Sequence, residues 1–139
     1  MPLAINKTLT PSWFTPKRFR SDDQPPRFYL QPITGAQRLE VLSEFDPGSK
    51  MFTARGVMLA LQYGLKDWEN IVNQRGKQIA YKWGNVQYLP ESVLTDVAFE
   101  IVAISDLESH DDEDEDDEDG EDSSGEVDET KIREGDTKN

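Results

Sequence analysis

Hydrophobic and polar residues alternate at the start of the predicted domain. In RFYLQPI, residues 27–33, Phe28 and Leu30 would point to one side of an extended chain. Tyr29 would point to the other side, which is the alternation typical of a strand. Because Pro32 has no N–H to donate to a neighbouring strand, we expect this strand at the edge of a sheet.

The next pattern is helical and begins at Thr34. Thr34 and Gln37 have the spacing of a capping box, in which each side chain bonds to the backbone N–H of the other residue. We expect the buried face of this helix to contain Leu39, Leu42 and Phe45, with Val41 beside it. The sequence Asp-Pro-Gly-Ser at 46–49 then predicts a turn.

A second helix is predicted over residues 53–63. Its buried stripe consists of Val57, Met58, Ala60 and Leu61. Leu59 lies outside this stripe, so we expect the helix to be covered on more than one side. Gly64 would end the helix, because glycine takes the left-handed conformation without strain, and Leu65 would supply the apolar contact that follows.

Shorter elements are predicted after this helix. Residues 66–72 are expected to form a short helix or turn, and residues 73–77 a turn. The apolar side of the first segment consists of Trp68 and Ile71. The alternation in 78–83 predicts a strand with one face made of Ile79, Tyr81 and Trp83. The Gly-Asn pair that follows would form a tight hairpin turn into a second strand at 86–89.

The strongest helical pattern covers residues 90–107. Pro90 suits the first turn of a helix, and the carboxylate of Glu91 complements the helix dipole there. One face contains Val93, Val97, Ile101 and Ile104, with Leu94, Ala98 and Leu107 beside it. The elements together predict a small, mainly helical α+β domain over residues 27–107, with three main helices and a short antiparallel hairpin. An all-α domain is the alternative.

A proline-rich arm is predicted before the domain, over residues 1–26. Its prolines disfavour helices and central strands, and they are Pro2, Pro11, Pro16, Pro25 and Pro26. Its basic cluster consists of Lys17, Arg18 and Arg20. We expect the arm to be extended, with its large aromatic residues packed on the domain or on a neighbouring subunit. These residues are Trp13, Phe14 and Phe19.

Charge divides the chain after residue 107. Residues 108–139 carry 17 Asp and Glu against 3 Lys and Arg, a net charge of −14. Residues 1–107 carry 11 Asp and Glu against 12 Lys and Arg, a net charge of +1. The two net charges sum to the −13 of the whole chain. All aromatic residues precede the acidic segment. It therefore cannot bury enough apolar surface to offset the entropy of ordering, and we predict that it is disordered.

Residues typical of catalytic sites are sparse. The chain has no cysteine, which excludes disulfides and thiolate chemistry, and it contains no phosphate-binding or hydrolase motif. The single histidine, His110, lies in the acidic flank, which offers no shaped pocket. Asp67 and Glu69 are expected to be exposed acids around a buried tryptophan. We therefore expect neither an enzyme nor a cofactor.

One acidic stretch has the skeleton of a calcium-binding loop. In EDDEDGEDSSGE, residues 115–126, Gly120 and Glu126 occupy the sixth and twelfth loop positions, with acids at the first, third and fifth. The eighth position is normally apolar, but here it is Asp122. Because no amphipathic helix leads into the stretch, we expect weak, diffuse cation binding and no metal site.

The chain lacks sequence signals for a membrane. No apolar run approaches the ~18 residues that a spanning helix needs. The first residues, MPLAINKTLTPSW, lack the apolar core of a signal peptide. We therefore expect a soluble, cytoplasmic protein.

Two motifs occur in a characteristic order. They are RFYLQPITGAQRLE at 27–40 and LQYGLKDWENI at 61–71, and a closing helix follows Leu89 and Pro90. In order and spacing they resemble the tail assembly chaperones of tailed bacteriophages, over residues 27–107. The matching positions in the two motifs are Pro32, Ile33, Thr34, Gly35, Arg38, Leu39, Gly64, Leu65, Trp68, Glu69 and Asn70. Two departures are Ile33, where leucine is more usual, and the long acidic segment.

This resemblance implies a non-enzymatic protein that acts in the host cytoplasm and is absent from the finished particle. Such proteins bind the tape-measure protein, keep it soluble and help to recruit tail-tube subunits. A partner of this kind needs an apolar strip, which the helices at 53–63 and 90–107 would supply. The residues expected to bind it are Val57, Met58, Leu61, Leu65, Trp68, Val93, Val97, Ile101 and Ile104. The acidic segment would keep the complexes apart by charge repulsion.

Two other functions remain alternatives. A virion structural protein, such as a minor head or connector component, would use the arm at 1–26 to bind a neighbouring subunit. The acidic segment could instead mimic DNA, although a flexible polyanion competes less selectively than charges held on a folded surface. We expect no membrane and no nucleic-acid partner, and self-association stays open.

Overall fold

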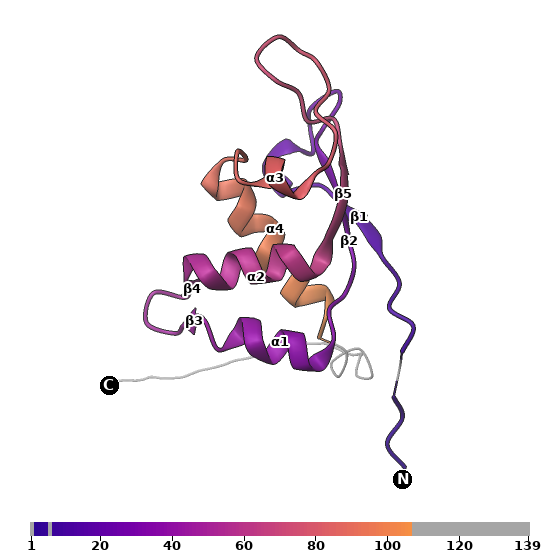
Figure 1. The fold of residues 1–139 in the computed structure, drawn as a ribbon, viewed down its shortest axis with the longest axis vertical. Coiled ribbons are helices and arrows are strands. Elements are labelled where there is room, and N and C mark those ends of the chain that lie inside the picture. Colours follow the sequence, from indigo (N-terminus) through magenta and orange to yellow (C-terminus); the bar gives the residue numbers. More distant parts are fainter. Residues whose placement is uncertain (1, 6, 107–139) are drawn as a thin grey trace, which may run out of the picture. The chain divides into compact units, whose positions relative to one another are not determined.

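The computed structural model describes residues 2–5 and 7–106, and the helices and strands described here lie in the unit formed by residues 1–105 (Figure 1). In chain order the elements are β1 (Ser12–Phe14), a 3-10 turn η1 (Lys17–Phe19), β2 (Arg27–Leu30), α1 (Gly35–Leu42), β3 (Phe45–Asp46), β4 (Met51–Phe52), α2 (Ala54–Gly64), β5 (Leu65–Glu69), α3 (Trp83–Val86) and α4 (Glu91–Ile104). These elements confirm the predicted α+β class. The predicted disordered segment, 108–139, lies outside the described residues.

The larger sheet has three antiparallel strands in the order β1-β2-β5, so β2 is central. The edge position predicted for a strand at 27–33 was therefore wrong. β2 ends at Leu30, and Pro32 lies beyond the ladder, where its missing N–H has no effect on strand pairing. The predicted alternation is confirmed, since the side chains of Phe28 and Leu30 are fully buried and Phe28 is paired with Trp68 of β5.

β1 lies within the segment predicted to be an arm. Its backbone is extended, but it pairs with β2 and so belongs to the sheet. The ring of Trp13 lies 4.8 Å from the ring of Tyr29, centre to centre, and the guanidinium of Arg27 lies 4.3 Å from the Trp13 ring centre. Two further aromatic residues pack against the core, Phe14 and Phe19. The large aromatic residues of this segment therefore pack on the chain's own domain.

α1 confirms the predicted capping box. The Thr34 hydroxyl oxygen accepts a hydrogen bond from the Gln37 backbone N–H (3.1 Å), and the Gln37 side chain accepts one from the Thr34 N–H (3.0 Å). The predicted buried face was wrong at Leu39, which is 71% exposed, whereas Leu42 packs against the core and Val41 is fully buried. Phe45 lies in β3, beyond the helix. In so short a helix with few apolar residues, the surface it docks against decides which face is buried.

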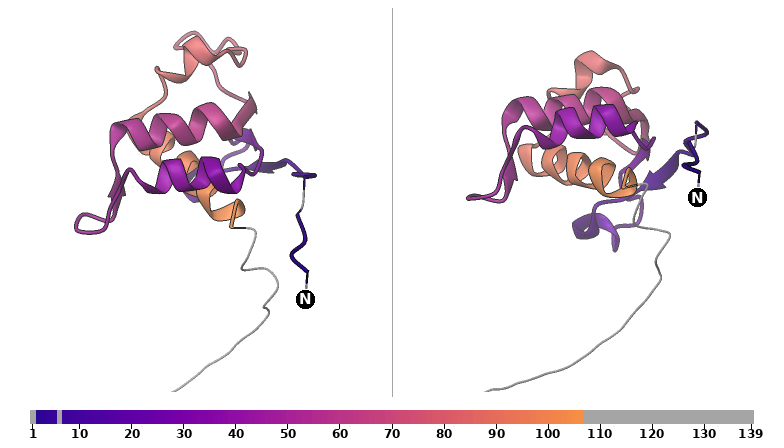
Figure 2. Two further views of the ribbon diagram at one scale, coloured as in Figure 1. Left: turned by 60° about the horizontal axis from the view of Figure 1, so that its bottom comes forward. Right: turned by 90° about the horizontal axis from the view of Figure 1, so that it is seen from below.

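α2 follows the turn predicted at 46–49, which is present between β3 and β4. The Asp46 carboxylate accepts a hydrogen bond from the Gly48 N–H (3.0 Å) and so stabilises that turn. Thr53 caps α2 by accepting one from the Gly56 N–H (3.2 Å). The helix packs against both α1 and α4 (Figure 2), as predicted from its apolar residues.

Gly64 has a different role from the one predicted. It is the last residue of α2, and among the described glycines only Gly76 has a positive φ, at 79°. A Cβ at position 64 would lie 2.5 Å from Cγ2 of Ile101 and 3.1 Å from the carbonyl oxygen of Gln31. Glycine is therefore needed here because two backbones and a core side chain approach closely, and not for a left-handed turn.

The segment after α2 is a strand, β5, so the short helix or turn predicted at 66–72 was wrong. β5 pairs with β2, and Arg27 forms an ion pair with Glu69, 42 positions away (2.7 Å). Trp68 is buried, and its indole N–H donates to the carbonyl oxygen of Ile79 (2.7 Å). A short segment with two apolar residues fits several local structures, and here the distant partner strand selects one.

The hairpin predicted at 78–89 does not form in this part of the described chain, where α3 lies instead. The Tyr81 hydroxyl donates to the carbonyl oxygen of Leu65 (3.0 Å), which holds the segment against the end of α2 and the start of β5. The turn predicted at 73–77 is present and is closed by one β-bridge from Val72. Side-chain bonds to the rest of the domain thus replace the predicted strand ladder.

α4 confirms the last predicted helix, although it ends at Ile104. Its buried residues are Val93, Val97, Ala98, Ile101 and Val102. The buried Ser105 follows it, and its hydroxyl donates to the carbonyl oxygen of Ile101 (2.5 Å) and accepts from the N–H of Ile33 (2.8 Å). This serine links the end of α4 to the segment before α1. Leu107 lies outside the described residues.

Candidate functional site

The residues predicted to bind a partner lie in or against the hydrophobic core. The buried ones are Leu61, Leu65, Trp68, Val93, Val97 and Ile101. Those half-buried against the core are Val57, Met58 and Ile104. The expected binding strip needs correction, because the apolar stripes of α2 and α4 pack against each other and their buried area is not available to a partner.

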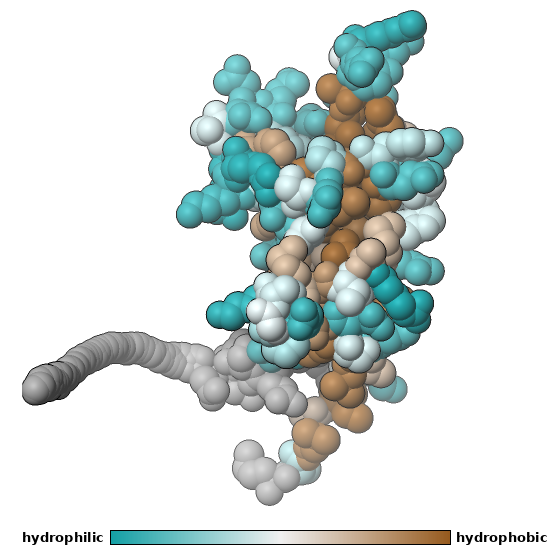
Figure 3. Space-filling model, turned by 90° about the vertical axis from the view of Figure 1, so that its left-hand side faces the viewer, coloured by the Kyte–Doolittle hydropathy of each residue, from teal (hydrophilic) through white to brown (hydrophobic). Residues whose placement is uncertain are grey.

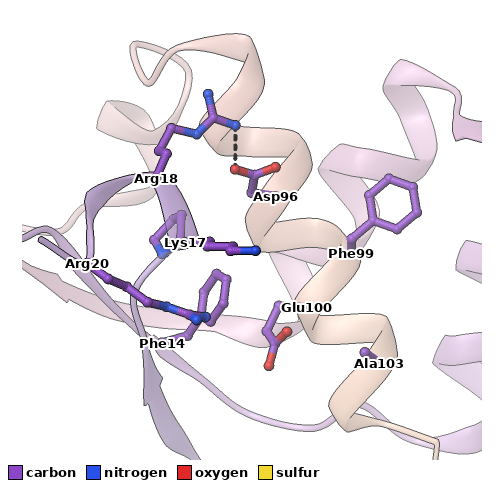
Figure 4. A pocket seen from close by; sticks show the side chains of 9 residues that line it. Phe14, Lys17, Arg18, Arg20, Asp96, Phe99, Glu100 and Ala103 are labelled. Atoms are coloured by element: carbon purple, nitrogen blue, oxygen red, sulfur yellow. Dashed lines mark hydrogen bonds and ion pairs between the residues drawn. The ribbon is translucent and has the colours of Figure 1, made fainter.

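A groove lies along the opposite, outer face of α4 (Figure 4). We call it the α4 groove; its volume is about 930 Å³, and its lining consists of Phe14, Pro16, Lys17, Arg18, Arg20, Asp96, Phe99, Glu100 and Ala103. A second hollow of about 550 Å³ shares Arg18 and Asp96 with it and adds Met51, Glu91, Ser92 and Thr95. The lining residues of α4 recur at helical spacing, so one continuous face of the helix forms the floor.

The opposite wall comes from the segment around η1. Pro16 is buried, and its carbonyl oxygen accepts a hydrogen bond from the Phe19 N–H (2.9 Å), which closes the turn. Because this turn follows β1, it carries the basic cluster across the outer face of α4. Figure 4 shows the side chains of Lys17 and Arg20 directed toward α4 from the other side of the groove.

An ion pair crosses the groove where its two hollows meet. Nη2 of Arg18 lies 2.5 Å from Oδ2 of Asp96 (Figure 4), and both side chains are more than a third exposed. An exposed pair of this kind contributes at most about 1 kcal/mol. A ligand that displaces the Arg18–Asp96 pair would therefore lose little binding free energy by breaking it.

Glu100 supplies a second carboxylate to the groove floor. Burial raises the pKa of this carboxyl, and the positive charge of Arg20 opposes that rise. The groove thus presents charges of both signs beside the apolar surfaces of Phe14, Phe99 and Ala103. Such a combination suits an amphipathic polypeptide segment.

The ring of Phe99 forms one rim of the groove. It packs against Phe52, with ring centres 4.9 Å apart, and against Phe45 at 6.5 Å, yet it remains 36% exposed. Met51 on β4 is also exposed beside this cluster. Apolar surface remains accessible elsewhere too, as the band of hydrophobic residues on one face shows (Figure 3).

Ligands for a metal ion do not gather in the part of the chain that the structure describes. Among those residues, no group of three or more His, Cys, Asp or Glu side chains is placed to hold a metal ion. His110 and the calcium-like stretch at 115–126 lie outside them. Within the same residues, none of the helices combines the length and apolar character that crossing a bilayer requires.

No protein-family model, curated protein or solved structure matches this chain. The sequence does contain two signals for the groove. The basic cluster at 17–20 was identified, and Phe99 is a lone aromatic residue on an otherwise polar face of its helix. The basic cluster and the outer face of α4 come together only in the folded chain, because Arg18 and Asp96 are 78 positions apart.

Proposed function

We propose that this chain is a non-enzymatic tail assembly chaperone of a tailed bacteriophage, which binds an amphipathic segment of the tape-measure protein in the α4 groove. The observation that carries the proposal is the groove itself. Together with the second hollow that adjoins it, the groove follows α4 from Glu91 to Ala103, a length of about 18 Å at 1.5 Å per residue. That length accommodates about three turns of a partner helix lying alongside.

The two motifs that resemble those of tail assembly chaperones support the proposal, because they form the scaffold beneath the groove. The motif at 27–40 supplies β2 and the capped α1, and the motif at 61–71 supplies the end of α2 and β5. Gly64 in the second motif permits close contact with Ile101, on the inner face of α4. In the first motif, the N–H of Ile33 donates to the hydroxyl of Ser105 at the end of α4 (2.8 Å), so both motifs contact α4 or its end.

The sheet and turn also favour this proposal over a virion structural role. The structural alternative requires the large aromatic residues of the segment at 1–26 to bind a neighbouring subunit. Those residues pack on the chain's own domain instead. We accordingly propose that the chain acts in the host cytoplasm, helps to recruit tail-tube subunits and leaves before the particle is complete.

Co-expression with the phage's longest helical protein tests the proposal. The soluble fraction of that protein should rise several-fold when the chain is present. Ala103→Arg should reverse most of this gain, because an arginine at this exposed position fills the groove without entering the core. Gln62→Arg is the matched control, since it adds the same charge at an exposed position of α2.

The results of the co-expression experiment test the chaperone function and its binding site separately. If the helical protein's solubility is indifferent to the wild-type chain, the chaperone proposal fails. If both arginine variants protect it as well as the wild type does, the chaperone function stands and the α4 groove is not its binding site. A stoichiometric band of this chain in purified particles would favour the structural alternative.

A further inference from the structure

A second surface, separate from the α4 groove, lies on the connection from Asn70 to Pro90, here called the loop, which includes α3 and the turn at the top of Figure 1. This loop contains Arg75, Lys77 and Lys82 but no Asp or Glu. The three cations are exposed, and none is in an ion pair with a described residue. The loop itself therefore carries three cations and no acid, and the nearby negative charge of Asp67 acts on Tyr81.

The same loop exposes large apolar side chains around a cavity. Val72 is 49% exposed, Trp83 42% and Tyr88 79%. The cavity has a volume of about 230 Å³ and is lined by Trp68, Ile71, Val72, Ile79, Asn85, Tyr88, Leu89 and Pro90. Small-molecule sites usually span roughly 300–1,000 Å³, so this cavity better fits one large side chain of a polypeptide.

Side-chain and backbone hydrogen bonds link the segments that line the cavity. The buried Trp68 donates to Ile79, as described above, and Nδ2 of Asn85 donates to the carbonyl oxygen of Ala80 (3.1 Å). The Ile79 N–H donates to the carbonyl oxygen of Ile71 (2.7 Å). A preformed site costs little conformational entropy when its ligand binds.

Charge and cavity lie close together along the loop. Each of the three cations is within three positions of a residue that lines the cavity, namely Val72 or Ile79. Residues that flank a ligand side chain in the cavity would then approach the segment that carries Arg75, Lys77 and Lys82. Such flanking residues of the ligand would be attracted to these cations if they were negatively charged.

We propose that the loop from Asn70 to Pro90 is a docking surface for an acidic polypeptide segment that carries a bulky apolar side chain. The cavity receives that side chain, and Arg75, Lys77 and Lys82 pair with the flanking carboxylates. The cavity, which is sized for one side chain, favours a polypeptide over a single-stranded nucleic acid, for which the loop offers two exposed aromatic rings, Trp83 and Tyr88. This proposal is independent of the proposed function, because the cavity shares no lining residue with the α4 groove.

Fluorescence anisotropy with a labelled twelve-residue peptide tests the proposal on the full chain. The peptide is glutamate-rich with one central phenylalanine, and a second peptide has alanine in that place. The phenylalanine peptide should bind about tenfold more tightly than the alanine peptide, because its ring is removed from water. Its affinity should fall as salt is added.

Charge variants locate the binding surface. The variant that combines Arg75→Gln, Lys77→Gln and Lys82→Gln should bind the phenylalanine peptide about tenfold more weakly than the wild type does. The control combines Lys7→Gln, Lys50→Gln and Lys66→Gln, which removes three exposed cations elsewhere and should leave affinity unchanged. The acidic residues of the chain itself are the same in every variant, and melting curves check that all variants are folded.

Several results would overturn the proposal. The first is that neither peptide binds the wild-type chain, and the second is that both peptides bind with equal affinity. The third is that the two triple variants lose affinity for the phenylalanine peptide to the same extent. Tighter binding of a single-stranded oligonucleotide of the same net charge, at the same salt concentration, would assign the loop to nucleic acid instead. None of these results depends on co-expression with the helical protein, so the two proposals can fail separately.

Discussion

At the scale of the residue, Ser105 joins segments that are distant in sequence. Its buried hydroxyl is bonded both to Ile33, 72 positions earlier, and to Ile101 within α4. No pattern of apolar positions marks this serine, which looks like an ordinary helix-terminal residue in the sequence. Its importance comes from the Ile33 N–H, which has no strand or helix partner to replace it in this position.

Ser105→Ala should therefore destabilise the domain. The substitution leaves the buried Ile33 N–H without its acceptor, which costs about 1–3 kcal/mol. Urea unfolding of the full chain measures the change. Ser43→Ala is the control, because the exposed Ser43 hydroxyl donates only to the carbonyl oxygen of Glu40 in its own helix. That variant should stay within about 0.5 kcal/mol of the wild type, and equal losses in both would contradict this account of Ser105.

At the scale of the element, α4 has two faces with different roles. Its inner face packs against α2, and its outer face forms the floor of the groove. The periodicity of Val93, Val97 and Ile101 identified the inner face, but sequence reasoning assigned it to partner binding. The structure shows those residues buried in packing, whereas Phe99 on the outer face remains 36% exposed.

Gly64→Ala tests how closely α2 and α4 must approach. The added methyl group would overlap the side chain of Ile101, so helix packing must shift, at a cost of about 1–3 kcal/mol. Gly35→Ala is the control, because a Cβ there meets nothing within 4 Å. It should leave the free energy of unfolding unchanged or raise it by up to about 1 kcal/mol. If the two variants unfold at the same urea concentration, the close approach at Gly64 is not limiting.

At the scale of the whole molecule, charge is the property most unevenly distributed. The net charge of +1 on residues 1–107 means that the described domain alone is nearly neutral, while residues 108–139 carry −14. Proteins near zero net charge associate more readily than strongly charged ones. The acidic segment therefore sets the colloidal behaviour of the chain.

A chain ending at Leu107 should be less soluble than the full chain near neutral pH at low salt. The difference should shrink as salt is added, because screening shortens the range of repulsion to about 8 Å at 0.15 M. Protein remaining in solution after centrifugation is the measurement. A full-length variant with its acidic residues after Leu107 replaced by Asn and Gln is the control for length. If that variant is as soluble as the wild type, charge repulsion is not the cause.

The sequence by itself determined the parts of this fold that depend on neighbouring residues. The capping box at Thr34, the existence of α2 and α4 and the turns at 46–49 and 73–77 follow from side chains within a few positions of one another. The sequence also separated a nearly neutral domain from an acidic segment, because composition needs no spatial information.

Only the tertiary structure decided the features that join distant segments. The strand β5, the buried face of α1 and the close approach at Gly64 each depend on a partner surface supplied by another part of the chain. The α4 groove has the same origin, since its basic wall and its helical floor are about 80 positions apart in sequence. Local patterns limit what each segment can form, but long-range packing selects one arrangement, because only that arrangement buries the apolar faces together.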